Sequence, residues 1–156
     1  HKSQLNQDYV NTLPTESYLP PSHQRQWIYW STFPGFVITL FPDQIEIYHS
    51  YPIGFQKSAM AGRSYALADD RPKMKSAREY NRQINIMVGE EDIQLVKWSA
   101  EGMRSSAFNG AIMSNLEIGT CAFHNQLRRT LPVTSLDVAP SIGTLAQTNQ
   151  QMVESD

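Results

Sequence analysis

The feature that most constrains the fold is a change of pattern near residue 70. Three segments before it, at 27–30, 36–41 and 44–49, are rich in aromatic and β-branched residues, and Pro-Gly and Pro-Asp pairs separate them. Such residues favour strands and such pairs favour turns. Beyond residue 72 the pattern becomes typical of helices. We therefore expect several strands followed by helices.

The strand segments predict an antiparallel meander. In the third segment Ile45 and Ile47 alternate with Glu46 and Tyr48, which is typical of a half-buried strand. A fourth strand is expected at about residues 58–68. Short turns between successive strands favour antiparallel pairing of neighbours.

Two helical regions follow the strands. Residues 73–87 contain neither Pro nor Gly. Residues 90–105 continue the helical pattern, and the residues that share one helix face are Asp92, Leu95, Val96, Ser99 and Met103. Ser114 with Glu117 three residues later is a capping box, which predicts a helix to about Leu131 that Pro132 stops.

These elements predict an α+β fold in which the helices are segregated from an antiparallel sheet. Residues 1–26 are an opening segment with a short helix or extended stretch and a loop, and residues 27–68 are the strands. Residues 73–131 are the helices, and residues 132–156 are a tail without a strong period.

Composition narrows the class of protein. The chain has 156 residues, is 40% hydrophobic and carries a net charge of -2, which suits one core and shows no basic stripe for a nucleic acid. The apolar run over 36–41 is too short to span a membrane. A single cysteine, Cys121, excludes an internal disulfide and predicts a reducing, cytoplasmic location. Because the chain opens at His1 without Met or a signal peptide, we expect it to be cut from a longer protein.

Asp92 is the first candidate for chemistry. It lies on the helical stripe, with Val88 four residues before it and Leu95 and Val96 after it. A carboxylate on an apolar face is costly unless it is paired or bound to a metal. The competing interpretation places Asp92 in the first turn of a helix, where acidic residues interact favourably with the helix dipole. Spacing alone favours this second interpretation without excluding the first.

The other reactive residue types carry weaker signals. His23, His49 and His124 have no metal-ligand neighbour at helical spacing, so a structural or surface role is predicted for each. His1 is uninformative by itself. Cys121 has no neighbour in the sequence that would activate it, which favours an apolar role.

Three stretches together resemble a known family. The segment Phe33–Tyr48, followed by Tyr51–Gly54, resembles the strand–turn–strand stretch of Rieske oxygenase large subunits. The run Glu91–Val96 resembles that family's helix carrying an iron-binding Asp, and Glu101–Ser105 resembles its Gln-x-Gly-Leu-x-Ser stretch with two replacements. The run Leu116–His124 resembles the closing helix, so the resemblance covers about residues 27–131.

The resemblance implies a partial domain with a helix-grip fold (START-like or Bet v 1-like) and a mononuclear Fe(II) held by two His and one carboxylate. Asp92 is then the carboxylate. His1-Lys2 resembles the end of the family's His-x-x-x-x-His segment, so His1 is expected to be the second histidine ligand, with the first one upstream. The strand residues Ile38 and Phe41 and the helical Val88 are expected to line an apolar substrate pocket.

The implied reaction is O₂-dependent hydroxylation or oxidative demethylation of a small organic substrate, either aromatic or a quaternary amine. Electrons would come from NAD(P)H through a ferredoxin or reductase and a [2Fe-2S] Rieske cluster. That cluster needs two Cys and two His, and one Cys cannot supply it, so the Rieske domain is expected to lie outside this chain and the chain alone is expected to be inactive. Family members imply a homotrimer, with neither nucleic acid nor membrane as a partner.

Two other classes remain open. One is a non-catalytic helix-grip module that binds a small molecule or lipid, since fold does not fix function. The other is an assembly subunit without iron. An oxygenase should place Asp92 at the floor of a cavity, whereas a binding module would leave it at a helix start or on the surface.

Overall fold

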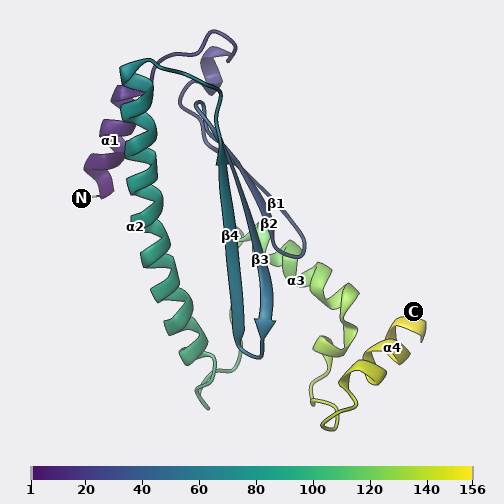
Figure 1. Ribbon diagram of the computed structural model, residues 1–156. Coiled ribbons are helices and arrows are strands. Elements are labelled where there is room, and N and C mark those ends of the chain that lie inside the picture. The colour runs from purple at the N-terminus through teal and green to yellow at the C-terminus, as the bar shows by residue number, and fades with distance from the viewer. Residues whose placement is uncertain (1, 156) are drawn as a thin grey trace. The chain divides into compact units, whose positions relative to one another are not determined.

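The structure, a computed structural model, describes residues 2–155 (Figure 1). Four strands form one sheet in the order β1-β2-β3-β4, so each strand pairs with the next in sequence. The predicted α+β class and the antiparallel meander are therefore confirmed. The elements in chain order are α1 (Lys2–Thr12), the 3-10 helix η1 (Pro21–His23), β1 (Ile28–Thr32), β2 (Phe36–Leu40), β3 (Ile45–Gly54), β4 (Lys57–Tyr65), α2 (Pro72–Gly102), α3 (Ile118–Thr130), the 3-10 helix η2 (Pro132–Ser135) and α4 (Leu145–Ser155).

The chain divides into two compact units. The first consists of His1–Trp30, Val37–His49 and Met60–Ala111, and the second of Ser31–Phe36, Ser50–Ala59 and Ile112–Asp156. The first unit holds α1, α2 and the inner parts of the strands. The second holds α3, η2 and α4.

The core of the first unit forms where α1 lies along the first half of α2 (Figure 1). Its buried members are Tyr9, Leu13, Met74, Ala77 and Ile84, and Leu5, Trp27, Tyr80 and Val88 pack against them. The α2 members recur at intervals of three, three, four and four residues, which places them on one face of a helix. This face is covered by α1 and by Trp27.

Helix α2 is a single helix over Pro72–Gly102, where the sequence predicted two successive helical regions. Pro72 occupies the first helical position, where its missing N–H costs nothing. Gly89 joins the two regions without a break, since an interior glycine costs only about 1 kcal/mol relative to alanine.

The register of the sheet decides which side chains face α2. Phe41 N–H donates to the Gln44 carbonyl at 2.9 Å, and Ser50 N–H donates to the Gly35 carbonyl at 2.7 Å. These two pairs place Thr39 opposite Glu46. On the other side of β3, a Cβ on Gly62 would lie 2.8 Å from the Tyr48 ring, so Gly62 lies opposite Tyr48.

Because side chains alternate across a strand, Thr39, Glu46 and Ser64 form one polar row on the α2-facing side. The burial predicted from the alternation along β3 is wrong: Glu46 is buried at 2% exposure, whereas Ile45 on the apolar side is 43% exposed, because the polar side of the strand faces α2. Ile45 and Ile47 point to the opposite face of the sheet. Ile38 shares that opposite face, because it alternates with Thr39.

In the second unit, Phe33 packs against Phe123 with ring centroids 5.3 Å apart. Ser114 N–H donates to the Glu117 carboxylate, as half of a capping box would, and α3 begins four residues after Ser114. The predicted end of this helix before Pro132 is confirmed. The final residues, predicted as a tail without a strong period, contain η2 and α4.

No helix within residues 2–155 combines the length and apolar character needed to cross a membrane.

Candidate functional site

A buried carboxylate, Glu46, is the centre of a hydrogen-bond network between the sheet and α2. Its Oε1 accepts from Asn85 Nδ2 at 2.6 Å and from Asn81 Nδ2 at 3.4 Å, both on α2. Within the sheet, Gln44 Nε2 donates to Oε1 at 2.6 Å, and the Tyr48 hydroxyl donates to Oε2. Ser64 Oγ on β4 lies 3.5 Å from Oε1. One side chain thus links β3, β4 and α2.

In this network the Glu46 carboxylate is surrounded by neutral hydrogen-bond donors in place of water. Burying a charge is costly unless hydrogen bonds replace its hydration, and none of the five partners of Glu46 is cationic. Burial, followed by the hydrogen bond to Glu46, raises the pKa of Tyr48. Tyr48 therefore remains a proton donor to Glu46 throughout the physiological range.

A cavity of about 510 Å³ opens beside this network, between β3, β4 and α2. Its size falls within the usual range for small-molecule sites. The residues around it are mostly polar: Gln44, Glu46, Tyr48, Gly62, Arg63, Ser64, Arg78, Arg82, Asn85 and Ile86. Gly62 has no side chain to displace the Tyr48 ring, which lies over it. Because Arg63 alternates with Gly62 and Ser64, it borders the cavity with its backbone and its side chain faces the other way.

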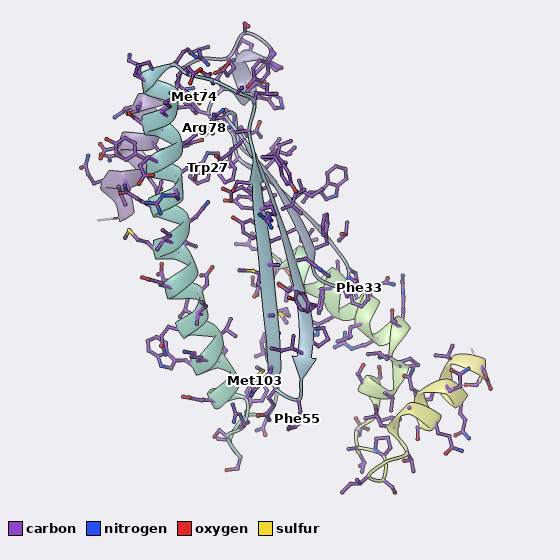
Figure 2. All side chains as sticks on the ribbon, viewed as in Figure 1. Trp27, Phe33, Phe55, Met74, Arg78 and Met103 are labelled. Atoms are coloured by element: carbon purple, nitrogen blue, oxygen red, sulfur yellow. The ribbon has the colours of Figure 1, made fainter. Side chains whose placement is uncertain are left out.

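A second buried acid lies at the turn between β2 and β3. Asp43 accepts a hydrogen bond from the hydroxyl of Tyr9, which is fully buried in α1. Burial raises the pKa of Asp43, and burial and the adjacent Asp43 carboxylate raise the pKa of Tyr9. Arg78, labelled on α2 in Figure 2, donates from Nη2 to the Asp43 carbonyl at 3.2 Å. This set ties the β2–β3 turn to both helices.

An ion-pair cluster fixes the start of α2. Arg71 donates to the Glu16 carboxylate and to both oxygens of Asp69, and its hydrogen bonds hold the pKa of Asp69 down to about 2. Glu16 is 7% exposed. The cluster connects the loop after α1 to the helix that carries the polar network.

Asp92 lies in the middle of α2, which begins at Pro72, so the interpretation that placed it in a first helical turn is wrong. Its side chain is exposed, as are those of its neighbours from Glu90 to Ser99. Asn85 and Asp92 are seven residues apart. This interval advances a helix by about 10 Å and returns it to within about 20° of the same direction. Asp92 therefore continues the helix face that Asn85 turns toward Glu46.

The other predicted site residues do not lie in one place. His1 falls outside the described residues. Phe41 borders a cavity of about 420 Å³ near the β2–β3 turn and packs edge-on against Trp27 at 5.3 Å. Val88 packs against the α1–α2 core, and Ile38 faces away from α2.

Within residues 2–155, no three His, Cys, Asp or Glu side chains are grouped closely enough to hold a metal ion. The described residues thus do not form a complete His₂–carboxylate site. Asp92 is an open carboxylate and fits one of its three positions.

Sequence reasoning missed Glu46 and its partners. A signal was present: Asn81 and Asn85 stand four residues apart on a helix face that also carries Ala77, Ile84 and Val88. Amides on a buried face require a polar partner. The sequence does not say that the partner is a glutamate in a strand.

A family model described as "Ring hydroxylating alpha subunit (catalytic domain)" matches residues 1–132. No curated protein and no solved structure matches the chain. The matched residues include the sheet, α2 with Asp92, the Glu46 network and α3. The chain belongs to the ring-hydroxylating alpha subunit catalytic-domain family, and its fold is the α+β, helix-grip-like partial domain expected of an oxygenase of this kind.

Proposed function

We propose that this chain supplies Asp92 as the carboxylate ligand of a mononuclear non-haem Fe(II) centre. The reaction would be O₂-dependent hydroxylation or oxidative demethylation of a small aromatic or quaternary-amine substrate. The observation that supports this most directly is the family match, which includes the helix that carries Asp92.

The position of Asp92 on α2 bears on the ligand role in two opposing ways. Asp92 continues the helix face of Asn85, but its side chain is exposed and lines neither of the two described cavities, which is the surface placement expected of a binding module. The ligand role therefore rests on the family match. Carboxylate oxygen and imidazole nitrogen are ligands that Fe(II) accepts in oxygenases.

His1 is proposed as a second ligand. His1 lies outside the described residues, so this assignment rests on the resemblance of His1-Lys2 to the end of the family's His-x-x-x-x-His segment. The third ligand is left to a residue outside the described chain.

Fe(II) would supply O₂ binding and activation, with electrons from NAD(P)H delivered through a ferredoxin or reductase and a Rieske cluster held elsewhere. Residues of this chain would do the rest. Asp92 would fix the metal, and the wall formed by Tyr48, Ser64 and Asn85 would orient the substrate. A homotrimer in the cytoplasm is part of the proposal.

A non-catalytic binding module is the second candidate. The cavity beside Glu46 and the incomplete metal-donor set within residues 2–155 favour it. Such a module would bind a small molecule in the cavity whether or not iron is present.

Anaerobic Fe(II) titration followed by metal analysis separates the two candidates. The chain joined to the segment that carries the remaining histidine ligand is expected to retain Fe(II), and Asp92→Ala in that same protein is expected to lose it. Glu90→Gln is the matched control, because Glu90 is exposed on the same helix and two residues away, about 200° around the axis. Equal iron content in the Asp92→Ala variant and the unmodified chain would refute the ligand role.

A further inference from the structure

We infer that Glu46 is a positioning residue. Its carboxylate fixes the rotation of α2 about the helix axis and so fixes the direction in which Asp92 points. The link to iron rests on the proposed function, whereas the claim about α2 does not.

The network around Glu46 adds directional contacts further along α2 than those of Arg78, whose Nη2 donates to the Asp43 and Leu67 carbonyls. The core side chains Ala77, Ile84 and Val88 make apolar contacts with α1, which hold the helix in place but define its rotation weakly. The amides of Asn81 and Asn85 have to meet Glu46 Oε1 at hydrogen-bond distance and angle. Asn81 Oδ1 has no hydrogen-bond partner among the described residues, so the selection of one arrangement rests on the bonds that the two asparagines donate to Glu46.

Glu46 is itself held rigidly by the sheet. Gln44 from the β2–β3 turn, Tyr48 from β3 and Ser64 from β4 donate to its carboxylate. Gly62 leaves room for the Tyr48 ring to lie flat against β4, where a Cβ would come within 2.8 Å of it. The acceptor for the two asparagines therefore stays fixed in the frame of the sheet.

The network lies next to the exposed part of α2, residues 90–99, which has no buried side chain to hold it. The last half-buried side chains before Asp92 are those of Asn85 and Val88, and every side chain from Glu90 to Ser99 is exposed. A rotation of α2 by about 20° would move a side-chain atom about 6 Å from the axis by roughly 2 Å. A shift of this size is enough to spoil a metal or catalytic geometry.

The first test measures α2 directly, without metal. Spin labels are placed at Arg63→Cys on the outer face of β4 and Gln94→Cys on α2 in a Cys121→Ser background, and pulsed EPR gives their distance distribution. Both labelled positions are exposed and lie in the first unit. Glu46→Ala and Asn85→Ala are each expected to broaden the distribution or shift its mean by about 2 Å.

Two further variants separate positioning from general destabilisation. Glu16→Gln disturbs a buried acid at the other end of α2 and is expected to leave the distance distribution unchanged. Glu46→Gln with its Oε1 retained keeps the acceptor of Asn85, Asn81 and Gln44, and this variant is expected to keep the narrow distribution. A thermal melt of each variant confirms that the chain is folded. An unchanged distribution in Asn85→Ala, or equal broadening in Glu16→Gln, would overturn the inference.

The second test connects α2 to the metal. Fe(II) affinity is expected to fall about 10-fold in Asn85→Ala, as it does when other residues that hydrogen-bond to or orient a metal ligand are removed, and to stay unchanged in Glu46→Gln. If Asp92→Ala leaves Fe(II) affinity unchanged, the proposed function fails while the EPR result still decides the role of Glu46. If Asp92→Ala loses Fe(II) but Asn85→Ala binds normally with a narrow distance distribution, the positioning role fails alone.

Discussion

Replacing Glu46 with alanine is expected to destabilise the first unit by about 2–4 kcal/mol. The change removes the acceptor of five side-chain donors, of which Asn81 is the most deeply buried at 1% exposure. A buried donor left without a partner costs about 1–3 kcal/mol. Asn85 and Tyr48 are half-buried and border the cavity, so water replaces part of what they lose.

The desolvation cost of the Glu46 carboxylate opposes this effect and keeps the expected loss of stability moderate. Taking a carboxylate out of water costs several kcal/mol, and Glu46→Ala removes that cost together with the hydrogen bonds. Glu46→Gln keeps one acceptor oxygen and the side-chain volume, so we expect it to lose only about 1 kcal/mol.

Urea denaturation monitored by tryptophan fluorescence measures both variants, because Trp27 packs against the core of the same unit. The slope of the unfolding free energy against urea concentration should stay constant while the midpoint falls. A Glu46→Ala variant within 0.5 kcal/mol of the unmodified chain, or one less destabilised than Glu46→Gln, would refute the description of Glu46 as a satisfied network centre.

Three further predictions concern the same unit. The pKa of Asp43 is raised on folding, so the native state binds the extra proton and loses stability as pH rises above about 4, the unfolded value. Asp43→Asn lacks this loss, so its stability relative to the unmodified chain should increase between pH 3.5 and pH 6.5 in urea titrations, and a constant difference would contradict the assignment. Tyr9→Phe removes the hydroxyl that donates to Asp43 and should lower the free energy of unfolding by about 2 kcal/mol. In the Asp43→Asn background the same substitution should lower it by less. Gly62→Ala should cost about 1–3 kcal/mol, because its Cβ would meet the Tyr48 ring at 2.8 Å, and a neutral result would mean that this ring moves freely.

Local patterns were sufficient to predict most of the architecture. The aromatic and β-branched segments before residue 70 gave four paired strands, and the Pro-Asp pair at 42–43 lies at the β2–β3 turn. The helical pattern after residue 72 predicted α2 and most of α3. These elements follow from side-chain period and turn chemistry, which act over a few residues.

The centre of the polar network could not be predicted in the same way. Glu46 in an alternating strand suggests a solvent-facing side chain, and its burial depends on Asn81 and Asn85, which are 35 and 39 residues away in sequence. Nothing local to β3 specifies those partners. Helix α4 was missed for a different reason, because its sequence is largely polar and its first turn has no acidic residue to signal a start.

The position of a bound metal tests the central claim most directly. Amide NMR spectra of the ¹⁵N-labelled chain, recorded anaerobically while paramagnetic Fe(II) is added, report which residues lie near the ion. We predict that signals broaden first around Asp92 on α2 and around the start of α1, and that Asp92→Asn abolishes the effect while Glu90→Gln does not. Broadening centred on the exposed carboxylates of Asp70 and Glu79, or an identical pattern in the Asp92→Asn variant, would contradict the assignment of Asp92 as the iron ligand.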